Sequence, residues 1–153
     1  MNPWPAPGWT LRGIQPGGAE EPFALASYGA AGRCAALVFY SHDFGPQSTQ
    51  VLLEFQRLAA EFDDAGTDLL ALSGNSLHAH RAWSGLLGLH FPLLSDPGLE
   101  VAALYGAALP EQYCAQHAAF LVDRAGRVRW QAAGEGTPPN AADMLAAAET
   151  LRL

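Results

Sequence analysis

Residues 34–74, CAALVFYSHDFGPQSTQVLLEFQRLAAEFDDAGTDLLALSG, decide the fold. Cys34 to Tyr40 is a continuous apolar run, which is typical of a strand buried on both faces. From Thr49 to Phe62 apolar residues recur at helical spacing, and a glycine follows as a stop signal. Residues 67–74 are a second apolar strand. The order strand, helix, strand predicts a right-handed crossover between two parallel strands.

The remaining chain extends this unit into an α/β domain. Before it, residues 16–33 are rich in turn residues and contain one short alternating segment. The segments after it are a helix at about 78–87, a short apolar stretch at 91–98, a short helix at 99–107, two strands within 117–131 and a final helix at 139–153 with Asn140 as its N-cap. We therefore predict one α/β domain, residues 1–153, with a central mixed β-sheet flanked by helices.

Composition excludes several classes of partner. The 153 residues carry a formal charge of −7, and the eight basic residues are scattered along the chain, so nucleic acid and an anionic membrane are poor partners. The amino-terminal residues lack a basic export signal, and the apolar run at 34–40 is too short to span a bilayer. Two cysteines far apart, Cys34 and Cys114, form neither a CxxC nor a metal-binding pattern. These features predict a cytoplasmic protein.

Several segments resemble those of a known family in both order and spacing. They are APGWTL (6–11), FALASYGAAGRCAALVFY (23–40), LLALSGNSLHAHRAW (69–83), LHFPLLSDPGLEVAALYGA (89–107) and AAFLVDRAGRVRW (118–130). The chain resembles a peroxiredoxin of the AhpC/TSA group, and in size and layout it is most similar to the bacterioferritin-comigratory and one-cysteine AhpE-like branches. This resemblance implies a thioredoxin-like fold.

The resemblance also implies a catalytic corner. In the family, a loop carries Pro, three residues, Thr, two residues and then the peroxidatic Cys, and a distant Arg completes the site. The helix N-terminus and the Arg lower the thiol pKa, the Thr orients the peroxide, and the thiolate becomes a sulfenic acid. In this sequence the corresponding positions are Ser41 for Pro, Gly45 for Thr, Ser48 for Cys and His117 for Arg. All four differ from the family pattern.

This set of differences predicts that ordinary peroxidase activity is lost. A serine hydroxyl cannot form a sulfenic acid, and it is a poor nucleophile without a neighbouring base. We expect a peroxiredoxin-like protein retained for binding or assembly. The alternative is that Ser48 replaces a native Cys to trap a reduced state, but Ser41, Gly45 and His117 count against it. The simplest role for Ser48 is a helix N-terminal residue whose hydroxyl bonds backbone N–H groups.

Cys114 offers a second alternative, because it lies three residues before His117. If the reactive thiol has moved there, the protein is an antioxidant thiol peroxidase that reduces hydrogen peroxide or alkyl hydroperoxides. The ordinary interpretation of Cys114 is a small buried hydrophobic residue. Cys34 opens the first strand at the opposite end of the sheet, so we expect no disulfide between the two.

Four histidines, His42, His78, His80 and His117, are expected at the sheet edge where α/β folds bind ligands. With Asp43 and Cys114 they suggest zinc as a minor alternative, but H-x-H occurs once without a second half, so we expect no metal and no cofactor. A hydrolytic triad of Ser48, His117 and Asp43 is less favoured still, since the G-x-S-x-G corner is absent.

Two expectations concern partners and packing. The resemblance implies a homodimer with the corner loops at its interface, and a peroxide or another small molecule is the expected ligand at the degenerate corner. The sequence places five aromatic side chains in the core, namely Trp83, Phe91, Tyr105, Phe120 and Trp130.

Overall fold

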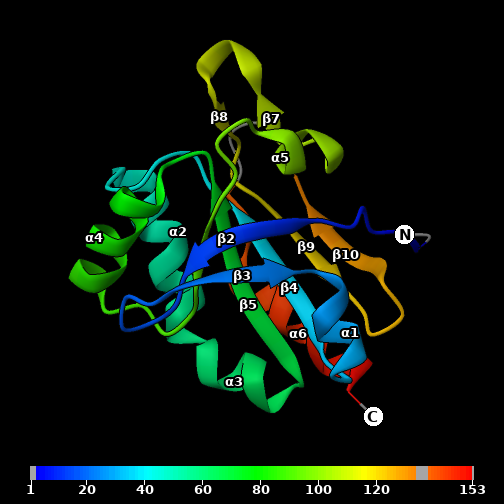
Figure 1. Ribbon diagram of the computed structural model, residues 1–153. Coiled ribbons are helices and arrows are strands. Elements are labelled where there is room, and N and C mark those ends of the chain that lie inside the picture. Colours follow the sequence, from blue (N-terminus) through cyan, green and yellow to red (C-terminus); the bar gives the residue numbers. More distant parts are fainter. Residues whose placement is uncertain (1–2, 134–137, 153) are drawn as a thin grey trace.

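A computed structural model describes residues 3–133 and 138–152 and contains an eight-stranded sheet with helices on both faces (Figure 1). Residues 1–2, at the start of the predicted domain, and 153, at the end of the predicted final helix, lie outside the described part. The strands are β1 (Trp4–Pro5), β2 (Thr10–Ile14), β3 (Glu20–Ala24), β4 (Cys34–Phe39), β5 (Thr67–Ser73), β6 (Leu93–Ser95), β7 (Ala108–Leu109), β8 (Cys114–Ala115), β9 (Ala118–Val122) and β10 (Arg127–Ala132). The helices are α1 (Ala26–Ala30), α2 (Pro46–Arg57), α3 (Ala59–Asp64), α4 (Leu77–Leu87), α5 (Glu100–Leu104), the 3₁₀ helix η1 (Pro110–Gln112) and α6 (Ala141–Leu151).

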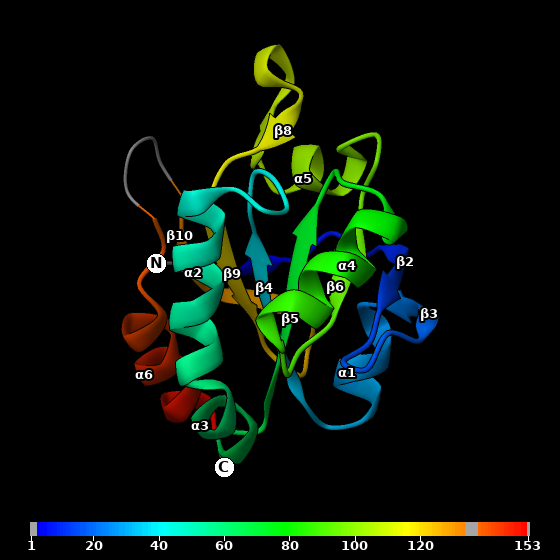
Figure 2. The ribbon, with the colours of Figure 1, turned by 90° about the vertical axis from the view of Figure 1, so that its left-hand side faces the viewer.

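The sheet is mixed, as predicted. Its strand order is β1-β10-β9-β4-β5-β6-β2-β3, with β4 parallel to β5 and β5 parallel to β6. The other neighbours in this sheet are antiparallel, including the predicted hairpin of β9 and β10. Strands β7 and β8 form a separate hairpin that projects beyond the main sheet in both views (Figures 1 and 2).

Two hydrophobic clusters sandwich the sheet, and this explains the continuous apolar run of β4. Alternate residues from Cys34 to Val38 pack with α2, α4 and α6 on one face. Ala35, Leu37 and Phe39 pack on the opposite face, which α5 also covers. Every side chain of β4 is therefore buried. Four of the five predicted core aromatic side chains are buried, and Trp130 is half-buried against the core.

The predicted helix at 49–62 is two helices. Helix α2 begins earlier, because Pro46 already has the fixed φ of a first helical position. It ends before Leu58, whose N–H donates to the carbonyl of Phe55 at 3.1 Å, and α3 follows directly. This tightened turn keeps the rings of Phe55 and Phe62 in one core cluster, with their centroids 6.1 Å apart.

The amino-terminal third contains elements that the turn-rich sequence did not predict in detail. β2 and β3 pair along Thr10 to Ala24, and α1 follows immediately. Most side chains of β3 are exposed, so its apolar signal is weak. At the other end of the chain, the predicted cap is confirmed: the Asn140 side chain accepts a hydrogen bond from the N–H of Asp143 at 3.0 Å. In the described residues, no helix is both long enough and apolar enough to cross a membrane.

Candidate functional site

The corner between β4 and α2 holds the candidate site. β4 ends at Phe39, residues 40–45 make the turn, and Gly45 precedes the helix in an extended conformation. Ser48 lies in the first turn of α2, and its side chain is fully buried. Its hydroxyl therefore faces the corner and not the solvent.

Three polar atoms form a compact triangle at this corner. Ser48 Oγ lies 3.1 Å from Ser41 Oγ and 3.1 Å from His117 Nε2, and Ser41 Oγ lies 3.4 Å from the same nitrogen. The backbone N–H of His42 also donates to Ser48 Oγ, at 3.4 Å. The structure thus brings together Ser41, Ser48 and His117 from three separate segments of the chain.

Burial lowers the pKa of His117, and the nearby His42 lowers it further. The imidazole is therefore neutral at pH 7 and has a lone pair on one nitrogen. With its hydrogen on Nδ1, the ring accepts a hydrogen bond from Ser48 at Nε2. A neutral ring in this position acts as a hydrogen-bond partner for a hydroxyl and supplies no positive charge.

Gly45 adjoins this triangle without contributing a side chain. A Cβ atom at Gly45 would lie 3.6 Å from Ser48 Oγ and 3.2 Å from the carbonyl oxygen of His42. As expected, Ser48 is a helix N-terminal residue whose hydroxyl accepts a hydrogen bond from a backbone N–H. The helix begins two residues before Ser48, and the donor is the N–H of His42, which lies outside the helix.

A second, fully buried network fixes the shape of the corner loop. The hydroxyl of Tyr40 donates to Asp43 Oδ1 at 2.6 Å, and His80 Nδ1 lies 2.6 Å from Asp43 Oδ2. The N–H of Asp43 donates to the side chain of Asn75 at 2.7 Å. Burial, and then the charge of Asp43, raise the pKa of Tyr40 well above its ordinary value, so this phenol keeps its proton. The loop is tied to α4 through His80 and to the segment after β5 through Asn75.

The protonation of His80 follows from its two partners. Nε2 lies 3.0 Å from the carbonyl oxygen of Leu94, which can only accept, so Nε2 carries a hydrogen. A further hydrogen lies between Nδ1 and Asp43. The sequence did not predict this pairing, because Asp43 and His80 are 37 residues apart and no local pattern joins them.

The hydrolytic triad of Ser48, His117 and Asp43, which the sequence already disfavoured, does not form among the described residues. Asp43 uses its two carboxylate oxygens on Tyr40 and His80, and no described hydrogen bond joins it to His117. The four histidines do not converge either, since His78 is exposed on α4 and His80 is buried within its own network. In residues 3–133 and 138–152, no cluster of three or more His, Cys, Asp or Glu side chains could hold a metal.

The two cysteines are buried and free. Cys34 lies opposite Thr67 of β5 in the sheet, at the end of β4 that is remote from the corner, as expected. Cys114 lies in β8, within the projecting hairpin. Burial raises the pKa of both thiols, so neither is an activated thiolate.

Comparison with known proteins identifies the family. Residues 5–131 match the model of the AhpC/TSA family. The chain belongs to that family. Among curated relatives, this AhpC/TSA-family chain is 31% identical to Peroxiredoxin-4 of Dictyostelium discoideum over 132 residues, which are 82% of this chain and 50% of that protein. It is 29% identical to a thioredoxin peroxidase of Echinococcus granulosus, over 81% of this chain and 66% of the relative.

Solved structures confirm the fold. The crystal structure of Enterococcus faecalis AhpC superimposes with a TM-score of 0.88 at 20% identity, covering 98% of this chain and 92% of that one. Mycobacterium tuberculosis AhpC gives a TM-score of 0.82 at 23% identity, covering 99% of this chain and 97% of that chain. The AhpC/TSA-family chain therefore has the thioredoxin-like fold that the sequence predicted.

Proposed function

We propose that this protein is a peroxiredoxin relative without ordinary peroxidase activity, retained for binding or assembly. In this proposal Ser48 occupies the peroxidatic position and Ser41, Gly45 and His117 occupy the positions of its partners. The observation that carries the proposal is the part-buried triangle of Ser41, Ser48 and His117, in which the Ser48 hydroxyl has two side-chain partners at 3.1 Å. Such a site offers hydrogen bonds to a ligand and no redox-active atom.

The state of the corner supports this proposal chemically. A peroxidatic thiolate needs positive charge nearby, whereas burial keeps His117 neutral by lowering its pKa. Nucleophilic use of Ser48 also lacks support, because the hydroxyl is fully buried and the imidazole lacks a carboxylate among its described partners. The remaining function of such a corner is recognition.

The alternative, a thiol peroxidase working through Cys114, lacks this support. Cys114 is buried in β8, and its pKa is raised rather than lowered. The further alternative, a natural Cys at position 48, leaves the differences at Ser41, Gly45 and His117 unexplained.

Stopped-flow kinetics with hydrogen peroxide tests the proposal. The pre-reduced protein should consume peroxide no faster than a free thiol. A matched variant that rebuilds the family pattern, Ser41→Pro with Gly45→Thr, Ser48→Cys and His117→Arg, should react faster, whereas Ser48→Cys alone should gain less. Rapid turnover by the parent protein would contradict the loss of activity. A correctly folded fourfold variant that stays inert would contradict the assignment of these four positions.

We also propose a homodimer that uses the loops near this corner. Phe44, on the corner loop, is 54% exposed although its ring lies 6.1 Å from that of Trp83, and Leu86 on α4 is 73% exposed. Exposed large apolar side chains on the corner loop and on α4 favour a protein interface at these elements. Light scattering of the parent and of Phe44→Ala should show a dimer that the substitution weakens.

Finer assignments remain part of the same proposal. We place the chain near the bacterioferritin-comigratory and one-cysteine AhpE-like branches, as one domain over residues 1–153. Two free thiols fit a reducing cytoplasm. A peroxide or another small hydrogen-bonding molecule is the ligand that the corner would accept, and calorimetric titration with hydrogen peroxide analogues that lack the O–O bond checks its binding.

A further inference from the structure

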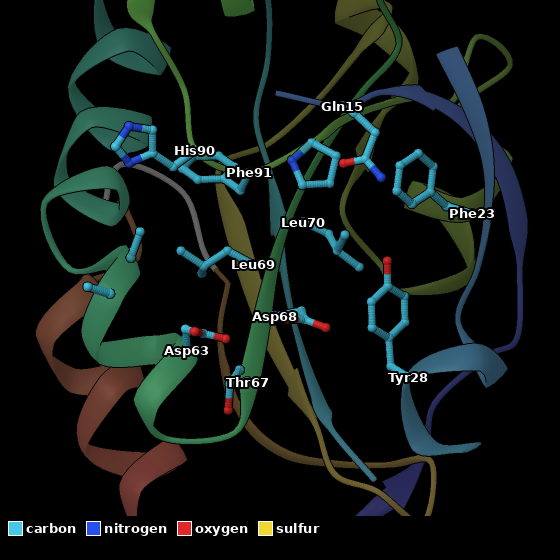
Figure 3. A pocket seen from close by; sticks show the side chains of 13 residues that line it. Gln15, Phe23, Tyr28, Asp63, Thr67, Asp68, Leu69, Leu70, His90 and Phe91 are labelled. Carbon is cyan, nitrogen blue, oxygen red and sulfur yellow. The ribbon is translucent and has the colours of Figure 1, made fainter. Parts of the chain in front are cut away.

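A pocket lies beside the amino-terminal half of β5, away from the corner (Figure 3). Its volume is about 490 Å³, within the range of about 300–1,000 Å³ that is usual for ligand sites. Four consecutive residues of β5, 67–70, line it. Leu69 and Leu70 point to opposite sides of the strand, so the pocket wraps around the edge of β5 and is not confined to one face of the sheet.

The edge is open because Pro92 ends the pairing of β5 with β6. The N–H of Ala71 donates to the carbonyl of Pro92 at 3.2 Å, and pairing continues from there to Ser73 and Ser95. One step earlier, the carbonyl of Leu69 would need the N–H of residue 92, which proline lacks.

Alternation along the strand fixes where the free groups point. Cys34 N–H donates to the carbonyl of Gly66 and Tyr40 N–H to that of Leu72, so the even-numbered residues of β5 face β4. The backbone N–H and carbonyl of Leu69 therefore point to the pocket side, just as the N–H of Ala71 points to the carbonyl of Pro92 before β6. Among the described residues, no hydrogen bond is found for the N–H or the carbonyl of Leu69. An added strand can pair with these two groups, since it brings one carbonyl for the N–H of Leu69 and one N–H for its carbonyl.

The pocket also has a defined charge. Asp63 and Asp68 line it, and each uses its Oδ1 on the guanidinium of Arg33, at 2.6 and 3.1 Å. Two carboxylates share one cation, so the group keeps a net negative charge, and its Oδ2 atoms have no described partner. The side chains of Asp63 and Asp68 are 75% and 36% exposed, so a ligand can reach them.

The remaining wall is aromatic and carries one hydroxyl. Phe23 and Phe91 are buried and line the pocket, and Tyr28 points its hydroxyl into it (Figure 3). Burial, followed by the charge of Asp68, raises the pKa of Tyr28 to about 12, so the hydroxyl stays protonated and can donate. The wall thus combines apolar contact area with a hydrogen-bond donor.

We propose that this pocket binds an extended peptide segment of a partner protein, which adds a short strand to the open edge of β5 and places a basic side chain beside Asp63 and Asp68. The edge groups of Leu69 pair with the peptide backbone. The carboxylates select a Lys or Arg, and the neighbouring apolar side chains of the peptide contact Phe23 and Phe91. The proposal does not depend on the chemistry of the Ser48 corner.

Nuclear magnetic resonance of the ¹⁵N-labelled protein tests the proposal with acetyl-Thr-Val-Arg-Val-Thr-amide as the probe. The amides of residues 67–70 should shift and saturate. Three singly N-methylated probes separate strand pairing from attraction of charge, since only alternate peptide N–H groups face the edge of a strand. Methylation at a facing position should weaken binding about tenfold, and methylation at a non-facing position should leave it unchanged.

Matched controls test the role of charge in binding the probe. Exchange of Arg for Glu in the probe should abolish binding, and Asp68→Asn should weaken it severalfold, whereas Glu149→Gln on the exposed face of α6 should not. Equal binding by all methylated probes, or equal binding by N-acetylarginine amide, would overturn the added strand and leave a site for a small cation. Shifts confined to residues outside the pocket would overturn the site itself.

Discussion

The hydroxyl oxygen of Ser48 lies 3.1 Å from Nε2 of His117, although the two residues are 69 positions apart in the chain. The contact joins the first turn of α2 to the segment just before β9. Because Ser48 is buried and His117 is half-buried, changes at either one affect stability as well as any ligand that the corner binds.

Replacement of Ser48 by alanine should destabilise the protein. The change removes the acceptor for the N–H of His42 and a partner of both Ser41 and His117. The cost should be about 0.5–1.5 kcal/mol, because these part-buried groups lose a hydrogen-bond partner. Urea unfolding measures it, and Thr49→Ser, which keeps its hydroxyl bond to the carbonyl of Gly45, is a control that should change little.

The lowered pKa of His117 predicts how stability depends on pH. In the unfolded chain this histidine takes up its proton near its ordinary pKa of about 6.5, whereas in the folded protein it does so only at lower pH. The unfolded state therefore binds more protons in this pH window. The stability that neutral His117 contributes is fully present above about pH 6.5 and is lost as the pH falls towards the pKa of His117 in the folded protein.

Unfolding of His117→Gln over pH 5 to 8 should isolate that contribution. The variant should lose part of the fall in stability that the parent shows below about pH 6.5. Identical pH profiles for the two proteins would show that His117 titrates alike in the folded and unfolded states.

Loss of the Asp43 carboxylate should be more costly than loss of Ser48. Asp43→Asn removes the charge and leaves one acceptor oxygen for the buried ring of His80 and the hydroxyl of Tyr40, and loss of one partner of a buried pair costs about 3–5 kcal/mol. Denaturant unfolding should show this. The double variant Asp43→Asn with His80→Gln should lose clearly less than the sum of the single changes, since the two residues interact directly.

Both thiols should resist modification in the folded protein. Burial of Cys34 and Cys114 raises their pKa, so little thiolate forms at pH 8. Reaction with a disulfide reagent should be slow in buffer and rapid in urea, with two thiols counted per chain. Fast labelling of Cys114 in buffer would instead support the thiol-based alternative.

Two glycines provide a matched test of packing. A Cβ at Gly29 would lie 2.5 Å from the carbonyl oxygen of Arg124, so Gly29→Ala should destabilise by about 1–3 kcal/mol. At Gly85, on the exposed side of α4, a Cβ meets nothing within 4 Å. Gly85→Ala should stabilise by about 0.5–1 kcal/mol, because alanine is the better helix former. Thermal unfolding of both variants compares the two effects.

The centre of the fold was predictable because its signals are local. β4 and most of β5 are buried on both faces, so β4 and residues 69–72 of β5 are continuously apolar. β3 and the two-residue strands β7 and β8 carry no such signal, because edge strands expose most side chains or are too short for a period to show. The break at Leu58 was also missed, since the apolar spacing runs on across it.

The residues of the candidate site were also predictable only in part. Family resemblance indicated Ser41, Gly45, Ser48 and His117 as a group, and no single pattern in the sequence does so. The network of Tyr40, Asp43 and His80 was not predicted, because hydrogen bonds between distant segments depend on the three-dimensional arrangement. Pro92 was visible in the sequence, but its effect on the edge of β5 depends on which strand lies beside it.

The buried tie from Asp43 to Tyr40 and His80 separates the architecture of the corner from its chemistry. Among the described residues, no hydrogen bond connects these three side chains to Ser48, so this part of the loop's framework does not depend on the residue at position 48. A corner built in this way holds its frame and its hydroxyl triangle through separate sets of contacts. Such a separation lets the group presented at a corner change while the frame around it persists.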